Sequence, residues 1–257
     1  MYKLFKRSHV PGVFEIQAAG ACDPGIARDH NEDAIALQED DGRGYYAAIV
    51  CDGMGGHNAG EVASALAVSV IAEHLAAQFA HQAPQALLEA AFALANRRIG
   101  ELAEVNPDAK GMGCTAVMVL GVKERLWVAH AGDSRCYRVR DGAIEQITSD
   151  HTMVQEMVDG GLLTPEQAAV HPYRGRISRC LGHGKNKSDA DVQEIELRRG
   201  DNLVLCSDGL SDVVAGDEIT ALAQQLDVRS AASRMVEAAN KRGGPDNVSA
   251  IVIRRIT

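Results

Sequence analysis

Apolar positions along the chain recur with two different periods, and these periods separate predicted helices from predicted strands. Residues 60–79 place apolar side chains at i, i+3, i+4 and i+7, which predicts a helix, and Pro84 opens a second helix that should end before Asn106. A second pair of helices is predicted at 217–226 and 230–241. Shorter apolar runs predict strands at 14–21, 34–38, 45–51, 115–120, 125–130, 134–140, 191–197, 202–206 and 248–254.

The order of these elements is strands, two helices, strands, two helices and a last strand. Because strands and helices do not alternate one by one, we expect mainly antiparallel sheets with helices packed outside them. The 257 residues, 46% of them hydrophobic, fit one large domain. Residues 150–187 break the rhythm with helix-like pieces, one starting at Thr164, and a polar stretch. We interpret this segment as an insert that covers a site.

The composition argues against nucleic-acid binding, a zinc site and a membrane segment. The net charge of −9 and the lack of a visible basic patch argue against a nucleic-acid partner. None of the six cysteines forms a Cys-x-x-Cys pair, so a zinc site is not expected, and buried free thiols favour a reducing cytosol. No signal-peptide core and no run of roughly 20 apolar residues is apparent, so we expect a soluble cytoplasmic protein without a membrane segment.

Aspartates stand at the ends of several predicted strands. Three apolar runs end on Asp52, Asp133 and Asp208, while Asp246 precedes the last strand and Asp33 lies after the first apolar stretch. Carboxylates that converge at the ends of buried strands cannot all stay ionised unless a positive charge compensates them. A hard divalent cation is the usual compensation, and oxygen ligands favour Mg²⁺, Mn²⁺ or Ca²⁺.

Each of these signals has an ordinary alternative when taken alone. Asp-Gly is often only a turn, but glycines such as Gly53 also let backbone carbonyls approach a cation. Arg28 has the default interpretation of a surface charge, yet it lies five residues before Asp33 and could grip phosphate oxygens beside the metals. Glu32 would face away from Asp33 in a strand, so we expect a supporting contact from it. His57 is a weaker candidate for proton transfer.

Taken together, the motifs resemble a known family. The chain is similar to the metal-dependent Ser/Thr protein phosphatases of type 2C in their compact bacterial form, from about residue 14 to 253. The matching pieces, in order, are Arg28-x-x-Asn31-Glu32-Asp33, Asp52-Gly53-Met54-Gly55-Gly56-His57 with Ala59-Gly60-Glu61, Gly113-Cys114-Thr115, Ala131-Gly132-Asp133-Ser134-Arg135, Ser207-Asp208-Gly209-Leu210 and Asp246-Asn247-Val248-Ser249.

The resemblance implies an α+β fold, a four-layer αββα sandwich of two antiparallel sheets flanked by helix pairs, with a dimetal cleft at one end. It implies one phosphatase domain over 1–257 with a flap at 150–187. Two Mn²⁺ or Mg²⁺ ions are expected, with a third, weaker one. The implied ligands are Asp52 bridging the two ions, Asp33 and the Gly53 carbonyl on one, Asp208 and Asp246 on the other, and Asp133 with Asp208 on the third.

The resemblance also implies hydrolysis of phosphoserine and phosphothreonine in proteins by a metal-bridging water, opposing a Ser/Thr protein kinase. Arg28 matches the phosphate-binding arginine, and Glu32 and Asn247 are expected as supporting residues. Phosphorylated proteins, among them a kinase and its targets, are the expected partners of a monomer. Arg174, Arg176 and Arg179 of the flap are candidates to contact an acidic or phosphorylated partner, or else form a solvated basic face.

One position departs from the family. Many eukaryotic members place a histidine acid directly after the Asp-Gly, where this chain has Met54, so the acid for the leaving group stays unassigned between His57 and a metal-bound water.

Two other functions fit the sequence less well. A non-catalytic relative should lack metal aspartates, and all five are present. A metal-dependent phosphodiesterase or nuclease fits poorly with the acidic composition.

Overall fold

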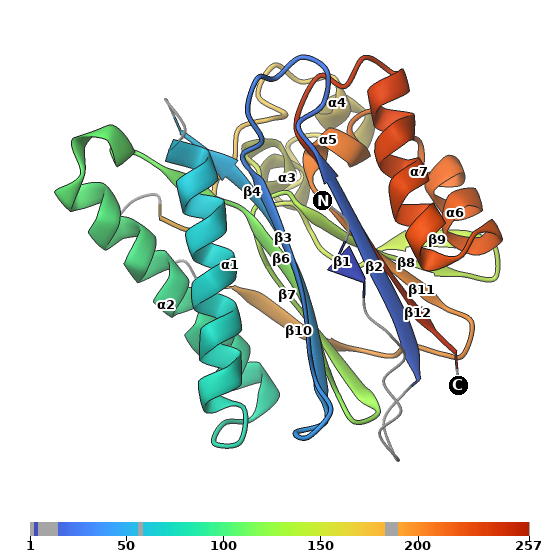
Figure 1. Ribbon diagram of the computed structural model, residues 1–257. Helices are drawn as coiled ribbons and strands as arrows, with labels where there is room; N and C mark the ends of the chain where they lie inside the picture. The colour runs from blue at the N-terminus through green and yellow to red at the C-terminus, as the bar shows by residue number, and fades with distance from the viewer. Residues whose placement is uncertain (1–2, 5–14, 56–58, 183–189, 257) are drawn as a thin grey trace.

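Two antiparallel β-sheets stacked face to face form the centre of the molecule (Figure 1). The computed structural model describes residues 3–4, 15–55, 59–182 and 190–256. The first sheet contains, in spatial order, β1 (Lys3–Leu4), β2 (Ile16–Asp23), β12 (Val248–Arg255), β11 (Asn202–Cys206), β8 (Arg135–Arg140) and β9 (Ala143–Gln146). The second contains β10 (Asp191–Ile195), β7 (Arg125–Ala131), β6 (Ala116–Val122), β4 (Tyr45–Met54) and β3 (Asp33–Asp40), with the short β5 (Gly113–Cys114) paired to β4.

Two pairs of helices cover the outer faces of the sheets (Figure 1). The second sheet is covered by α1 (Ala59–Gln78) and α2 (Pro84–Val105), and the first by α6 (Gly216–Gln225) and α7 (Val228–Lys241). A single 3₁₀ turn, η1 (Pro107–Ala109), follows α2. Three short helices lie elsewhere: α3 (Met153–Asp159), α4 (Pro165–Ala169) and α5 (Asp208–Ser211).

Three separate apolar cores hold these four layers together. Ile71 and Phe92 belong to the core between the helix pair and the second sheet, and Met235 to the core on the opposite side. Val50 and Leu205 belong to the core between the two sheets. Strand side chains alternate between faces, so each central strand contributes to two cores at once. This arrangement confirms the predicted four-layer αββα sandwich.

The predicted helices and longer strands are confirmed within two or three residues, whereas the short elements were missed. Sequence periodicity did not predict β1, β5, β9 or α5, each of two to four residues, because such short runs carry no measurable period. A turn at Asp141 and Gly142, with positive φ at both residues, joins β8 to β9.

Helix α1 corrects one expectation. Its 20 residues are long and apolar enough to cross a membrane by length and composition, contrary to the prediction that no such segment exists. Within the described structure, however, α1 packs on α2 and on β4, and its buried face includes Ala63, Ile71 and Leu75. A core helix of a sandwich passes the same length test, so this packing accounts for its apolar composition.

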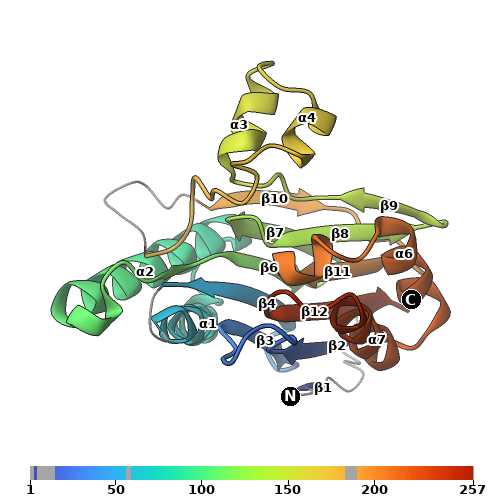
Figure 2. The same ribbon diagram turned by 90° about the horizontal axis from the view of Figure 1, so that it is seen from above.

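The segment that contains α3 and α4 projects from the sandwich, and the chain returns to it at Leu181, which is buried in the core of the second sheet. Seen from above, α3 and α4 form a lobe beyond the edge strands β9 and β10 (Figure 2). The predicted helix start at Thr164 is confirmed as a capping box with Gln167. Because the sheets are antiparallel, β3 and β12 begin at the same end of the sandwich at which β4, β7 and β11 finish. That end carries the aspartates, next to the lobe.

Candidate metal centre

Five strand-end aspartates meet at this end of the sandwich. Asp33 opens β3 and lies directly opposite Asp52 in the register of β3 and β4. Asp208 opens α5 after β11, and its side chain is in hydrogen-bond contact with that of Asp52. Asp133 follows β7, and Asp246 precedes β12. Asp133, Asp208 and Asp246 line one cleft of about 650 Å³. The structure therefore brings together all five residues predicted as metal ligands; their ligand role remains a prediction.

Burial and mutual repulsion disturb the ionisation of these carboxyl groups. Burial is the largest cause that raises the pKa of Asp33 and of Asp133 to about 7 and of Asp208 to about 6. Burial, followed by the charge of Asp33, also raises the pKa of Asp52 well above its ordinary value. Arg135, the arginine nearest to Asp133 along the chain, does not pair with the cluster, because its Nε and terminal nitrogen bond to Asp150 at 2.6–3.1 Å.

The donor set fits a hard divalent cation. Asp33 Oδ1 is buried, and no described residue donates a hydrogen bond to it. A buried carboxylate oxygen without a donor is costly unless a cation fills the position. The cluster offers only oxygen atoms, which suit Mg²⁺ or Mn²⁺ rather than zinc. We infer that the residues present fit the predicted metal ions.

Neutral groups hold the carboxylates in place. The Ser207 hydroxyl donates to Asp33 Oδ2 at 2.8 Å and accepts from the Ser249 amide at 3.0 Å. The Thr115 hydroxyl accepts from the Asp52 amide at 3.1 Å and lies 2.7 Å from the hydroxyl of Ser134. These four residues lie within the family motifs, but the sequence alone indicated no role for them. The local signal of Ser207 and Ser134 is a hydroxyl side chain next to a strand-end aspartate, which Thr115 and Ser249 do not have.

Glycine at position 53 is required by a close approach of three backbone segments. A Cβ on Gly53 would lie 2.1 Å from the Gly60 carbonyl oxygen and 2.6 Å from that of Glu32. The Gly53 amide donates to the Glu32 carbonyl at 3.0 Å. The Glu32 carboxylate, whose pKa burial raises, accepts from the Gly60 amide in the first turn of α1. Glu32 thus ties the start of α1 to the site, a supporting contact.

Asn247 fixes the loop that carries Arg28. Its side-chain amide donates to the carbonyl oxygens of Pro24 and His30, both at 2.8 Å, and its carbonyl accepts from the Glu32 amide at 2.8 Å. Asn247 is 5% exposed, so these bonds are protected from water. One side chain therefore orders both ends of the loop.

Arg28 pairs with Asp246, a predicted metal ligand that lines the cleft. Its terminal nitrogen is 2.8 Å from Asp246 Oδ2, and the two side chains are 51% and 38% exposed. An exposed pair of this kind contributes only about 0.2–1 kcal/mol, so the guanidinium can exchange its partner at little cost. The loop geometry is otherwise constrained, because the amides of Ile26 and Ala27 both donate to the Gly244 carbonyl.

Two positions in the sequence bear on the acid for the leaving group, His57 and Met54. His57 and Gly56 lie outside the described residues. Met54, which occupies the position of the family histidine, ends β4 and is half-buried.

Gly132 turns with a φ of +111° immediately before Asp133, above Thr115, and so directs Asp133 into the cleft.

Comparison with known proteins gives a consistent result. The model of the protein phosphatase 2C family matches residues 27–252. The serine/threonine protein phosphatase PstP of Mycobacterium tuberculosis is 41% identical over 92% of this chain. A putative protein phosphatase 2C-type protein of Streptococcus pyogenes is 37% identical over 90% of this chain and 94% of its own length.

Among solved structures, the catalytic domain of PstP in complex with two manganese ions superposes with a TM-score of 0.80 at 38% identity, covering 94% of this chain and 99% of that one. The chain spans only 44% of the full-length mycobacterial relative. The family match covers most of the chain, including every aspartate of the cluster. The chain therefore belongs to the protein phosphatase 2C family.

Proposed function

We propose that this chain hydrolyses phosphoserine and phosphothreonine in proteins in a reaction that requires Mn²⁺ or Mg²⁺. The observation that carries the proposal is the cluster of five aspartates around an undonated oxygen of Asp33, with raised pKa values for Asp33, Asp52, Asp133 and Asp208. The manganese-bound structure of PstP and the names of the relatives support it. The coarser expectation of phosphoprotein substrates follows from the same relatives.

The ion positions are proposed from the same residues. Asp52 would bridge two ions, with Asp33 and the Gly53 carbonyl on one side and Asp208 and Asp246 on the other. Asp133 with Asp208 would hold a third. When bound, such ions supply a water of lowered pKa for attack on phosphorus and neutralise charge on the phosphoryl oxygens. No protein nucleophile is needed in this chemistry.

Arg28 would hold the phosphoryl group. Its guanidinium is half exposed next to Asp246, which lines the cleft, and presents paired donors suited to phosphate oxygens. Asn247 and the Gly244 carbonyl hold its loop from the same segment before β12 that carries Asp246. The same part of the fold therefore positions Arg28 and the carboxylate of Asp246. This arrangement favours a substrate anion between the arginine and the aspartates.

The biological setting is also proposed. Opposition to a Ser/Thr kinase would follow from the substrate class. All six cysteines are free thiols, which favours a reducing compartment such as the cytoplasm. We propose a monomer that acts there on phosphorylated proteins.

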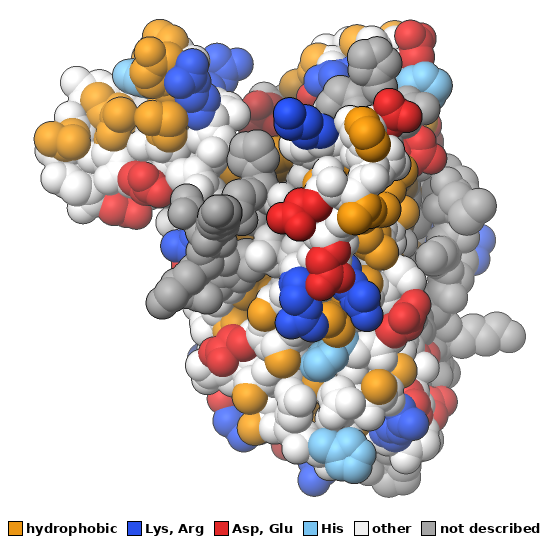
Figure 3. Space-filling model, turned by 90° about the vertical axis from the view of Figure 1, so that its left-hand side faces the viewer, with side chains coloured by type: hydrophobic (Ala, Val, Ile, Leu, Met, Phe, Trp, Pro, Cys, Tyr) orange, Lys and Arg blue, Asp and Glu red, His pale blue; other side chains and the backbone are white. Residues whose placement is uncertain are grey.

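We further propose that residues 150–187 form a flap within a single domain spanning 1–257; residues 183–187 lie outside the described part. The cleft of the aspartates extends to the lobe, whose Val154, Val158, Ala168 and Arg174 line it. Figure 3 shows hydrophobic side chains gathered on this lobe beside positive ones. Its exposed apolar residues are Leu162, Val170 and Tyr173.

The three flap arginines differ in position. Arg174 lines the cleft, Arg176 lies 4.2 Å over the ring of Tyr173, and Arg179 pairs with Asp191. Only Arg174 therefore faces the proposed substrate path among them.

Metal dependence tests the proposed function directly. EDTA should abolish hydrolysis of p-nitrophenyl phosphate and of a phosphothreonine peptide, and Mn²⁺ or Mg²⁺ but not Ca²⁺ should restore it. Asp246→Asn should reduce turnover by orders of magnitude, while Asp41→Asn, at an exposed position, should not. Undiminished activity in excess chelator, or a preference for bis-p-nitrophenyl phosphate, would sink the proposal.

Without metal ions, the protein should become more stable as the pH falls from about 8 to about 5.5. The folded-state pKa of Asp33 and Asp133 is about 7, above the unfolded value near 3.9, so the folded state binds more protons in this window. The free energy of unfolding therefore falls as the pH rises through it.

Thermal unfolding in EDTA checks this sign. Asp33→Asn should flatten the profile, and saturating Mn²⁺ should remove the advantage of low pH. An apparent melting temperature in EDTA that rises toward pH 8 would contradict the raised pKa values.

Arg28→Ala should raise KM for phosphomonoesters about tenfold while metal affinity stays nearly intact, because the charge-assisted contact to phosphate is lost. Arg97→Ala, an exposed arginine on α2, is the matched control and should change neither. Steady-state kinetics and calorimetry with Mn²⁺ measure the two effects. Collapse of Mn²⁺ binding with unchanged KM would place Arg28 in the metal centre instead.

Arg174→Ala should raise KM for phosphopeptides several-fold and leave p-nitrophenyl phosphate kinetics within about twofold, since the small substrate does not reach the flap. Arg198→Ala, an exposed arginine far from this cleft lining, serves as control. Equal losses on both substrates would place the flap in the catalytic core.

A further inference from the structure

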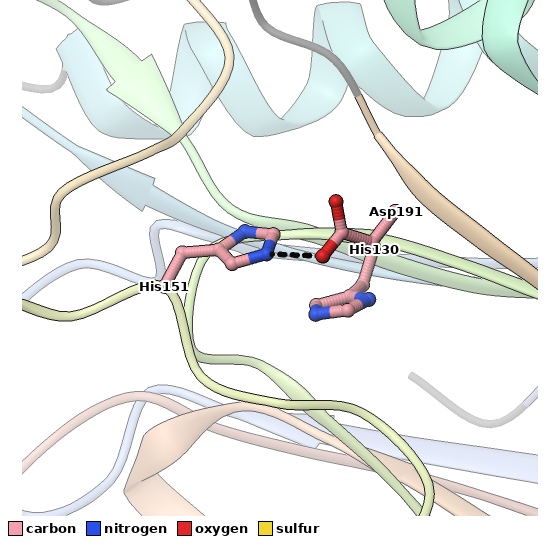
Figure 4. A group of neighbouring side chains, drawn as sticks. All are labelled: His130, His151 and Asp191. Atoms are coloured by element: carbon pink, nitrogen blue, oxygen red, sulfur yellow. Dashed lines mark hydrogen bonds and ion pairs between the residues drawn. The ribbon is translucent and has the colours of Figure 1, made fainter. Parts of the chain in front are cut away.

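A buried histidine pair lies between the flap and the aspartate cluster. His130, in β7, and His151, just before α3, stack with ring centroids 4.5 Å apart and are 2% and 7% exposed. Asp191, the first residue of β10, lies beside them, and Figure 4 shows the His151 ring directed at its carboxylate. Neither histidine has a role in the proposed chemistry.

The hydrogen bonds of His151 determine which nitrogen carries its proton. The Gly132 amide donates to His151 Nδ1 at 3.1 Å, so Nδ1 has no proton. The proton then lies on Nε2, which is 3.1 Å from Asp191 Oδ2 and donates to it. Burial, followed by the neighbouring His130, lowers the pKa of His151, which keeps the ring in the neutral form that this arrangement needs.

The cluster is a hydrogen-bonded link and not a metal site. A metal ion binds imidazole in the plane of the ring at about 2.0–2.1 Å from nitrogen. The planes of His130 and His151 are inclined by only 18°, so they do not intersect close to the stacked rings. The two histidines cannot direct in-plane lone pairs at one ion without a rotation that breaks the bond to Gly132 or to the Ser149 carbonyl.

The backbone of His151 joins the same two regions as its ring. Its amide donates to the Gly132 carbonyl at 3.0 Å, so both polar groups of Gly132 are bonded to one residue. Its carbonyl accepts from the Ser178 amide at 2.8 Å, where the flap returns. Arg179, the next residue, is 2.5 Å from Asp191 Oδ1.

The turn before Asp133 requires glycine at position 132. Its φ is +111°, and a Cβ there would lie 2.6 Å from the side chain of Thr115. Asp133 follows directly. The direction of the Asp133 side chain therefore depends on a turn whose two backbone polar groups are both bonded to His151.

We propose that His151 is a positioning residue that sets Asp133 and the base of the flap together. Its Nδ1 side holds the turn that aims Asp133 into the cleft, and its Nε2 side holds the flap base through Asp191 and Arg179. The kinetic part of this inference rests on the proposed phosphatase function; the structural part does not.

Two substitutions separate the two sides of the ring. His151→Asn retains an acceptor near the position of Nδ1, and His151→Gln retains a donor near the position of Nε2. Amide exchange of Gly132 in the metal-free protein, followed by NMR, reports the turn without requiring catalysis. It should accelerate about tenfold in His151→Gln and stay within about threefold of wild type in His151→Asn.

The kinetics should divide in the same way. His151→Gln should lower kcat about tenfold on p-nitrophenyl phosphate and phosphopeptide alike and raise the half-saturating Mn²⁺ concentration. His151→Asn should retain kcat on p-nitrophenyl phosphate and change KM for the phosphopeptide, as Asp191→Ala should, because only the link to the flap is lost.

If both His151 variants change Gly132 exchange and the kinetics on all substrates equally, the proposal is overturned. The imidazole ring would then contribute only by packing. Unchanged Gly132 exchange in His151→Gln would overturn the proposal too. If that variant does not fold, the ¹⁵N chemical shifts of the wild-type His151 ring show which nitrogen carries the proton. A proton on Nδ1 would refute the proposed hydrogen bonds. If the Gly132 amide exchanges as expected in both variants but the protein has no phosphatase activity, the positioning role of His151 stands. Only the proposed function is then refuted.

Discussion

Electrostatic repulsion among buried carboxylates is the interaction on which the architecture of this cleft depends. Burial is the largest cause that raises the pKa of Asp33, Asp52 and Asp208, and the charge of Asp208 raises the pKa of Asp33 and Asp52 further. A protein that merely needed stability at this position would place an arginine or apolar residues there. The nearest arginine along the chain from Asp133 is Arg135, and it is engaged by Asp150. The charge is left for ions.

The sandwich makes this concentration of charge tolerable by supplying neutral support. Hydroxyl and amide groups donate to or accept from the aspartates without neutralising them, as Ser207 does for Asp33 and Thr115 for Asp52. Asn247 orders the loop on the other side of the cleft through three bonds. These contacts connect both sheets at the end where their strands begin and finish. The predicted metal ligands are therefore held by apolar cores beneath them and by polar bonds around them.

Local sequence signals predicted the helices, the long strands and the aspartates of the site, because each is marked by a period or by a residue at a strand end. Contacts between distant residues were beyond such reasoning. Ser207 bonds to Asp33 across 174 positions, and only the stacking of the sheet that contains β11 on the sheet that contains β3 brings them together. The pair of Arg28 with Asp246 and the link from His151 to Asp191 have the same origin. Hydroxyl and histidine side chains carry no periodic signal that reveals such partners.

The most direct measurement of the central claim is anomalous diffraction from crystals soaked in Mn²⁺ and collected at the manganese absorption edge. The account predicts strong peaks among the side chains of Asp33, Asp52, Asp208 and Asp246, with Asp52 between two of them. Weaker density beside Asp133 would mark the third ion. An absence of manganese at these carboxylates under saturating Mn²⁺, with the fold intact, would contradict the account.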